Sequence, residues 1–303
     1  MIEVSRGRDG DTHHGTFRNL RFEDVNWVAG GGAIVGIAAS TSHNADVHDI
    51  VFYNNTFKNC GVGYDWGTND NDHHGVKVDG WLGFSGSTTR RIWIIENRPL
   101  GGDSPDPIDG RIKSLSGNLV QVGDQITASG GAHHVYVAGN YQEYGRQALG
   151  WTKRSRDVIF SPNFCTETYA LAGGNGQCYG HQYVAFSNWW ISNVATESAA
   201  AWMHTGGDDM EGPLYVIGNI FYGNKDEESD DNWRRCSGVT LFTGFGIHYF
   251  VNNVFDDQCH GIWAGNFAFD ADSEMHVYNN IFARISSPVD STSRALTISG
   301  ANG

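Results

Sequence analysis

Short apolar runs recur along the chain, and each of them ends at an asparagine. The segments 50–57 (IVFYNNTF), 214–221 (LYVIGNIF) and 275–282 (MHVYNNIF) show the frame, with apolar residues three before the asparagine and two after it. Alternation with a period of two predicts a strand, then a corner, then another strand. Eight positions fit this frame: Asn55, Asn97, Asn140, Asn163, Asn188, Asn219, Asn253 and Asn280.

The spacing of these asparagines predicts an imperfect repeat, with intervals of 42, 43, 23, 25, 31, 34 and 27 residues. A unit this short has too little apolar surface to fold alone, whereas stacked units bury a continuous core. No amphipathic helical period lies between the asparagines, and the gaps are rich in turn-forming residues. Stacked asparagine side chains would hydrogen-bond to one another along the axis. We therefore predict an all-β chain, with one right-handed parallel β-helix domain over residues 1–303 and about nine or ten coils.

The asparagine-ended runs resemble the coils of the pectin-lyase-like parallel β-helix superfamily, and the resemblance extends over nearly the whole chain. That superfamily includes polysaccharide lyases, glycoside hydrolases, epimerases and phage tailspikes, so the fold names no reaction. The resemblance implies a substrate that lies along one exposed face, in a groove walled by loops. We therefore expect a carbohydrate-active protein, and our first hypothesis is a polysaccharide lyase that cleaves a uronate-containing glycan. A glycoside hydrolase and a non-catalytic glycan-binding or structural β-helix, such as a tailspike or surface adhesin, are the alternatives.

The formal net charge of −14 argues against a nucleic-acid partner. The charge is uneven, because residues 90–156 hold 9 basic and 6 acidic side chains, whereas residues 157–303 hold 5 and 17. A locally basic region can seat an anionic polysaccharide, since local potential matters more than total charge. A solvated charged face is the alternative explanation. The 10 tryptophans could stack on sugar rings or simply fill the interior.

Five cysteines predict two disulfides and one buried thiol. Cys165 and Cys178 would close a short loop that contains glycine. Cys236 and Cys259 would link neighbouring coils, and Cys60 would be free in the interior. Disulfides favour an oxidising compartment, so we expect a secreted or extracellular protein, although no signal peptide is visible. The chain contains no run of about 18 apolar residues, the length that could span a membrane. The chain opens almost directly in a coil, which suggests a trimmed amino terminus that lacks its cap.

Five segments come into approximate register when the coils are aligned on the asparagines, and they could stack about 4.8 Å apart. These segments are 74–79, 123–127, 149–154, 201–204 and 239–242. They predict an outward column of polar side chains from neighbouring coils, made of Lys77, Asp124, Lys153 and His204. A slip of one residue would reverse the direction of each side chain.

β-Elimination on a uronate polymer requires a base for the proton at C5 and a cation on the substrate carboxylate. The run 151–157 places three cations beside a predicted strand, and crowded positive charge lowers the pKa of a lysine. We predict that Lys153 is the base and that Arg154 or Arg156 holds the carboxylate. Asp124 and His204 are further catalytic candidates. The alternative for this run is a turn with solvated cations.

The predicted substrate-binding residues are Lys77, Trp151, Trp202, Asp208 and Asp209. The last two belong to 205–211 (TGGDDME), which resembles the paired aspartates of polygalacturonase-type β-helix hydrolases. A glycosidase needs two carboxyl groups beside the scissile bond. The Asn-Thr-Asp and Gly-His-Gly segments of that family are absent here, so a hydrolase is the second hypothesis.

Two oxygen-rich loops, 65–72 and 102–109, contain the ligand types that calcium prefers, and calcium is the helper that the resemblance to lyases implies. Exposed acidic turns are the alternative. His-His pairs stand at 13–14, 73–74 and 133–134, at positions that differ relative to the asparagines. Because neighbours on a strand point to opposite faces, we predict no zinc site and no metal-binding residues. The chain contains no nucleotide-binding or serine-hydrolase motif.

Overall fold

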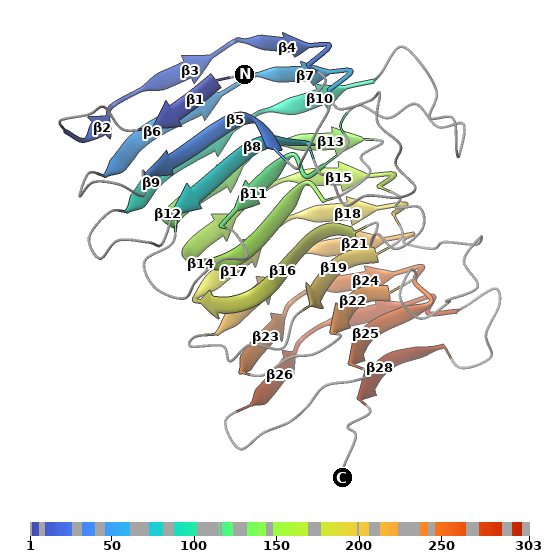
Figure 1. The fold of residues 1–303 in the computed structure, drawn as a ribbon. Coiled ribbons are helices and arrows are strands. Elements are labelled where there is room, and N and C mark those ends of the chain that lie inside the picture. Colours follow the sequence, from blue (N-terminus) through green and yellow to red (C-terminus); the bar gives the residue numbers. More distant parts are fainter. Residues whose placement is uncertain are drawn as a thin grey trace.

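The strands of this chain wind into a solenoid (Figure 1). The structure is a computed structural model that describes residues 2–5, 10–25, 32–39, 46–60, 73–80, 88–101, 115, 117–123, 132–143, 148–168, 177–198, 200–205, 213–223, 237–241, 246–264, 273–286 and 293–298. Within these ranges every regular element is a strand, and no helix occurs.

Three stacks of parallel strands, which we name the first, second and third sheets, run along the axis. The first sheet contains β1 (Ile2–Ser5), β5 (Gly32–Ala39), β8 (His73–Gly80), β11 (Val120–Val122), the start of β14 (Gly150–Phe160), β16 (Gln177–Phe186), β19 (Ala200–Thr205), β22 (Ser237–Leu241), β25 (His260–Ala264) and β28 (Arg294–Ile298). The second contains β2 (Thr12–His13), β3 (Thr16–Arg18), β6 (Val47–Tyr53), β9 (Thr89–Ile95), β12 (His133–Ala138), the end of β14, β17 (Asn188–Ile191), β20 (Leu214–Ile217), β23 (Ile247–Val251) and β26 (Glu274–Tyr278). The third contains β4 (Arg21–Glu23), β7 (Thr56–Lys58), β10 (Arg98–Leu100), β13 (Tyr141–Glu143), β15 (Phe164–Thr166), β18 (Val194–Thr196), β21 (Ile220–Tyr222), β24 (Val254–Asp256) and β27 (Ile281–Ala283).

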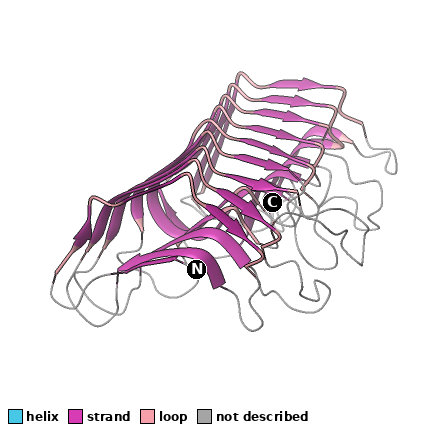
Figure 2. Ribbon diagram, turned by 90° about the horizontal axis from the view of Figure 1, so that it is seen from above, coloured by secondary structure: helices cyan, strands magenta, loops and turns pink. Residues whose placement is uncertain are grey.

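Successive coils supply neighbouring strands in each sheet, as in the pairs β5–β8, β6–β9 and β7–β10. The long strand β14 passes from the first sheet into the second, with a register shift between Lys153 and Ser155. Seen from above, the strands and corners of successive coils lie over one another (Figure 2). The fold is the right-handed parallel β-helix that the sequence predicts, while the number of coils stays a prediction.

Alternation along each strand decides which side chains face the interior. In β8, Val76 and Val78 are fully buried and belong to the core, whereas Lys77 between them is partly exposed. In the second sheet, Phe52 and Phe160 are likewise fully buried. Burial of these apolar side chains from every coil forms one continuous core, which is the dominant stabilising contribution in a solenoid.

Asparagine side chains form a hydrogen-bonded ladder at the corner between the second and third sheets. Each Nδ2 donates to the Oδ1 of the next asparagine over 2.9 to 3.1 Å. The residue before each corner asparagine adopts a left-handed conformation in most coils, for example Asn54 (φ 51°), Glu96 (φ 56°) and Asn252 (φ 56°). The ladder runs through Asn55, Asn97, Asn140, Asn163, Asn193, Asn219, Asn253 and Asn280.

One predicted rung of this ladder is wrong, because Asn193 and not Asn188 stacks on Asn163. Asn188 lies at the start of β17, where its Nδ2 donates to the Ser155 carbonyl and its Oδ1 accepts from the Val158 amide. Both asparagines follow a serine, and both serines have a positive φ. A Ser-Asn pair with a left-handed serine therefore occurs at both positions. The contact with the neighbouring coil decides which asparagine joins the ladder.

Cysteine chemistry agrees in part with the prediction. Cys165 and Cys178 form a disulfide, and Cys60 is a buried free thiol whose pKa burial raises to about 11. Cys259 is also disulfide-bonded, and its predicted partner Cys236 lies outside the described residues. In the part of the chain that the structure describes, no helix is long and apolar enough to cross a membrane.

Candidate functional site

The outer face of the first sheet brings together several of the predicted polar residues. The backbone register aligns Gly36 with Lys77, Lys77 with Gln121, and Gln121 with Trp151. Gly150 faces the interior, because a Cβ there would overlap the ring of the core residue Phe160. The next residue, Trp151, and the residues in register with it therefore lie on the outer side of the sheet. A Cβ at Gly36 would meet nothing within 4 Å, so the surface on that side of Lys77 is open. On the other side, Gln121 and Trp151 are only 2% and 6% exposed. The Lys77 ammonium pairs with the Asp79 carboxylate at 3.3 Å.

Lys153 lies on the same face, in the outward row next to that of Lys77. It stands two residues after Trp151, is partly exposed, and aligns with Gln182 of β16. Gly123 (φ 86°) packs against its backbone so closely that a Cβ there would overlap the Lys153 carbonyl oxygen. Lys77 and Lys153 therefore share a face, but they do not lie in one straight row.

Two predicted site residues point into the core, which corrects the interpretation from the sequence. The His204 side chain is fully buried, and its Nδ1 lies 3.1 Å from Nε2 of His248. Burial first, and the neighbouring histidines second, hold the pKa of His204 well below its usual value, so the ring is neutral at pH 7. Trp202 is also fully buried and packs edge-on against Trp190 at a centroid distance of 5.4 Å. Neither side chain can contact a polysaccharide on the surface, because a two-residue period places both on the inner side of β19.

Of the other predicted residues, the two arginines lie among the described residues and the three aspartates do not. Arg154 (φ 41°) lies at the bend in β14 and is partly exposed. Arg156 is exposed but belongs to the second sheet, where it aligns with His133, so it does not share the row of Lys153. Asp124, Asp208 and Asp209 lie outside the described residues.

Aromatic side chains dominate the outer face of the second sheet. The register places Trp93, Tyr136, Ile159, Trp189, Tyr215, Tyr249 and His276 in one row. From Trp189 onward the rings stack on one another, with centroid distances of 3.6, 5.1 and 4.5 Å and interplanar angles of 7 to 11°. Ile159 is the one aliphatic member of this set, and it interrupts the row between Tyr136 and Trp189.

Left-handed residues form a bulge near the start of each second-sheet strand over five coils. They are His14 (φ 55°), Asp49 (φ 57°), Arg91 (φ 52°), His134 (φ 53°) and Asp157 (φ 52°). The bulge breaks strict alternation, so the adjacent rings of His13 and His14 contact each other, as do those of His133 and His134. Two of the three His-His pairs thus occupy equivalent positions, contrary to the sequence interpretation.

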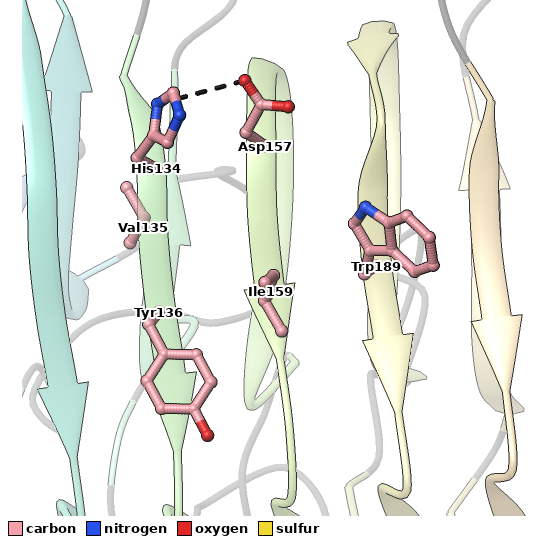
Figure 3. Close-up of a pocket in the computed structure, with 6 residues that line it drawn as sticks. All are labelled: His134, Val135, Tyr136, Asp157, Ile159 and Trp189. Atoms are coloured by element: carbon pink, nitrogen blue, oxygen red, sulfur yellow. Dashed lines mark ion pairs between the residues drawn. The ribbon is translucent and has the colours of Figure 1, made fainter.

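A shallow pocket of about 340 Å³ opens on this face, between Tyr136 and Trp189. Ile159 lies between the two aromatic residues, and the side chains of His134 and Asp157 stand at one end (Figure 3). His134 Nδ1 and Asp157 Oδ2 are 4.0 Å apart. Beside them, burial and then the charges of Arg156, His134 and Arg90 lower the pKa of His133 to about 4.

Sequence reasoning missed this pocket, although a signal for it was present. Each outward residue of the row stands four positions before a ladder asparagine, as Tyr136 does before Asn140 and Trp189 before Asn193. The predicted ladder contained Asn188 in place of Asn193, so Trp189 did not stand four positions before a predicted ladder asparagine. The correct register alone makes the row visible.

No described group of histidine, cysteine, aspartate or glutamate side chains is arranged to hold a metal ion. The two predicted calcium loops, 65–72 and 102–109, lie outside the described residues. Calcium therefore stays a prediction.

Comparison with known proteins assigns no family to this chain. No model of a protein family and no curated protein matches this sequence. Among solved structures, the chain is similar to the A-module of the mannuronan C-5 epimerase AlgE4 of Azotobacter vinelandii, with 11% identity over 95% of this chain and 90% of that one, and a TM-score of 0.36. The stacked parallel strands of the chain itself confirm the parallel β-helix that the sequence predicts.

Proposed function

We propose that this chain is a polysaccharide lyase that cleaves an extracellular, uronate-containing glycan on the outer face of the first sheet. The observation that supports this is the placement of two partly exposed lysines, Lys77 and Lys153, on the outer face of the first sheet. Cations can hold the substrate carboxylates there. The Cys165–Cys178 disulfide supports an oxidising, extracellular location.

The reaction assigns one role to each group. Lys153, as the neutral amine, takes the proton from C5 of the uronate. The electron pair left on C5 forms the C4–C5 double bond while the bond from C4 to the glycosidic oxygen breaks, and the leaving oxygen takes up a proton. Arg154, which follows Lys153 in the chain, would neutralise the carboxylate and stabilise the charge that develops at C5. Lys77 would hold a neighbouring sugar. Trp151, the other predicted contact on this face, is only 6% exposed, so its ring offers little surface to a sugar.

The test is ultraviolet absorbance of unsaturated uronate after incubation with alginate, polygalacturonate and glucuronan, with and without a chelator. The expected result is absorbance with at least one polymer and its loss in Lys153→Ala. Lys153→Ala with full activity would contradict the assigned base, and no unsaturated product from any uronate polymer would contradict the lyase.

The same incubation separates the two alternatives. New reducing ends without unsaturated product would indicate a hydrolase, and Asp208→Asn and Asp209→Asn would then test the paired carboxylates. Binding without any turnover would indicate a glycan-binding or structural protein. No described residue favours either alternative over the lyase.

A further inference from the structure

The pocket on the second sheet lies away from the outer face that carries Lys153, and it has features of its own. From Trp189 to His276 the stacked rings cover one another's faces, so these rings present mainly their edges to solvent. Trp189 is the end of this stack. Among the described residues no ring stacks on its face toward Ile159, because Ile159 takes the aromatic position in the adjacent coil. A flat apolar surface is thus left open on one side of the pocket.

The dimensions of the pocket fit one sugar ring. Tyr136 and Trp189 belong to strands two coils apart, which corresponds to about 9.6 Å at the usual strand spacing. A ring held between two side chains needs about 3.5–4.0 Å on each side. The volume of about 340 Å³ is at the small end of ligand pockets, which suits a single pyranose residue over the Ile159 side chain.

The polar end of the pocket differs from the equivalent position two coils away. There, Asp49 and Arg91 bind each other with two bonds of 2.7 and 2.8 Å, so the carboxylate is occupied. In the pocket, His134 and Asp157 are 4.0 Å apart and are 59% and 43% exposed, which leaves the Asp157 oxygens accessible. A carboxylate accepts hydrogen bonds from a pair of neighbouring hydroxyl groups, and an imidazole can donate or accept a third.

We propose that this pocket is a glycan-binding subsite, which holds one pyranose residue of a polysaccharide between Tyr136 and Trp189 with its hydroxyl groups on His134 and Asp157. Binding uses the ring face and the hydroxyls, so it does not require a carboxylate on the sugar. The inference rests on the proposed function only for the kind of ligand, a polysaccharide, and the chemistry at Lys153 is not part of it.

The experiment is titration calorimetry of the full chain with hexamers of galacturonate, mannuronate and xylose, on the Lys153→Ala background so that no cleavage interferes. At least one hexamer should bind, and Trp189→Ala should weaken its binding about tenfold, the loss expected for one stacked ring. Asp157→Asn should weaken it by a smaller factor, and Trp189→Phe should restore most of the affinity.

The matched control is Phe164→Ala. Phe164 is an exposed aromatic residue, 37% accessible, that stacks on Tyr141 of the third sheet at 5.3 Å. It should leave affinity unchanged. Equal losses in Phe164→Ala and Trp189→Ala, unchanged affinity in Trp189→Ala with a native melting curve, or no binding of any hexamer would each overturn the subsite. Failure of the lyase would appear separately, as absent turnover in the unmodified chain.

Discussion

The outer faces of the first and second sheets are built on the same coils, yet they carry different chemistry. The first presents Lys77 and Lys153 in two adjoining rows, whereas the second presents a row of aromatic rings that ends at a pocket. The inner side chains of both sheets pack into one core, so they must be apolar or mutually hydrogen-bonded. The outer side chains have no such restriction. A solenoid can therefore carry two surfaces of different chemistry on one framework.

The largest expected effect is on the rate of elimination, which should depend on the first sheet and not on the second. Lys153→Ala should lower the rate of elimination by about 10²–10⁴-fold, since a general base contributes this much. Tyr215→Ala, on the second sheet, should leave the rate on a short oligosaccharide unchanged. Initial rates of both variants measure this difference. Equal losses in the two variants would show that the faces do not act independently.

Substitution of a glycine on the first sheet should have the next largest effect, in this case on the free energy of unfolding. Gly123→Ala places a Cβ against the Lys153 carbonyl at a φ of 86°, so we expect a loss of about 3 kcal/mol in the free energy of unfolding. Urea denaturation measures it. Gly36→Ala is the control, because a Cβ there has open space. A Gly123→Ala variant as stable as Gly36→Ala would contradict the close packing at Lys153.

The ladder asparagines tie the second sheet to the third, and their loss should cost somewhat less. Asn253→Ala removes the acceptor of the Asn219 amide and of its Nδ2, each at 3.0 Å, and we expect about 2 kcal/mol of destabilisation. The adjacent Asn252, exposed and left-handed at φ 56°, provides the control Asn252→Gly, which should change stability by less than about 0.5 kcal/mol. Similar losses in both variants would mean that the ladder adds nothing beyond the turn.

The smallest effect concerns the shared interior and its response to acid. Burial lowers the pKa of His248 from 6.5 to about 4. The unfolded chain therefore binds more protons than the folded one between these values, and stability falls as the pH drops below about 6.5. Between pH 7 and 5 this residue should contribute a loss of about 1–2 kcal/mol. Denaturation of His248→Gln at both pH values should show a smaller difference than the unmodified chain, and an identical difference would exclude His248 as the cause.

Much of the fold could be predicted because its signal is local and repeated. Seven of the eight corner asparagines were placed correctly, since each follows an apolar residue by three positions and precedes a new strand. Asn188 failed because two Ser-Asn pairs lie five residues apart in one coil, and both fit the local frame.

The candidate site could be predicted less well, because the direction of a side chain depends on register. The sequence placed Lys77 and Lys153 on one face, but it also placed His204 and Trp202 there, and both of these point inward. A displacement of one residue along a strand has this effect. The bulge at His134 and Asp157 adds a further break in alternation that no composition signal announces.

The sequence by itself therefore determined the β-helix, the asparagine corners, the Cys165–Cys178 pairing and the region rich in cations, because each depends on neighbouring residues or on a simple repeat. Only the tertiary structure decided which rows face outward, which of Asn188 and Asn193 stacks on Asn163, and where the row of rings opens into a pocket. These features depend on how one coil settles on the next. That alignment is set by side-chain packing between residues some 23 to 43 positions apart, which the local pattern of a single coil does not contain.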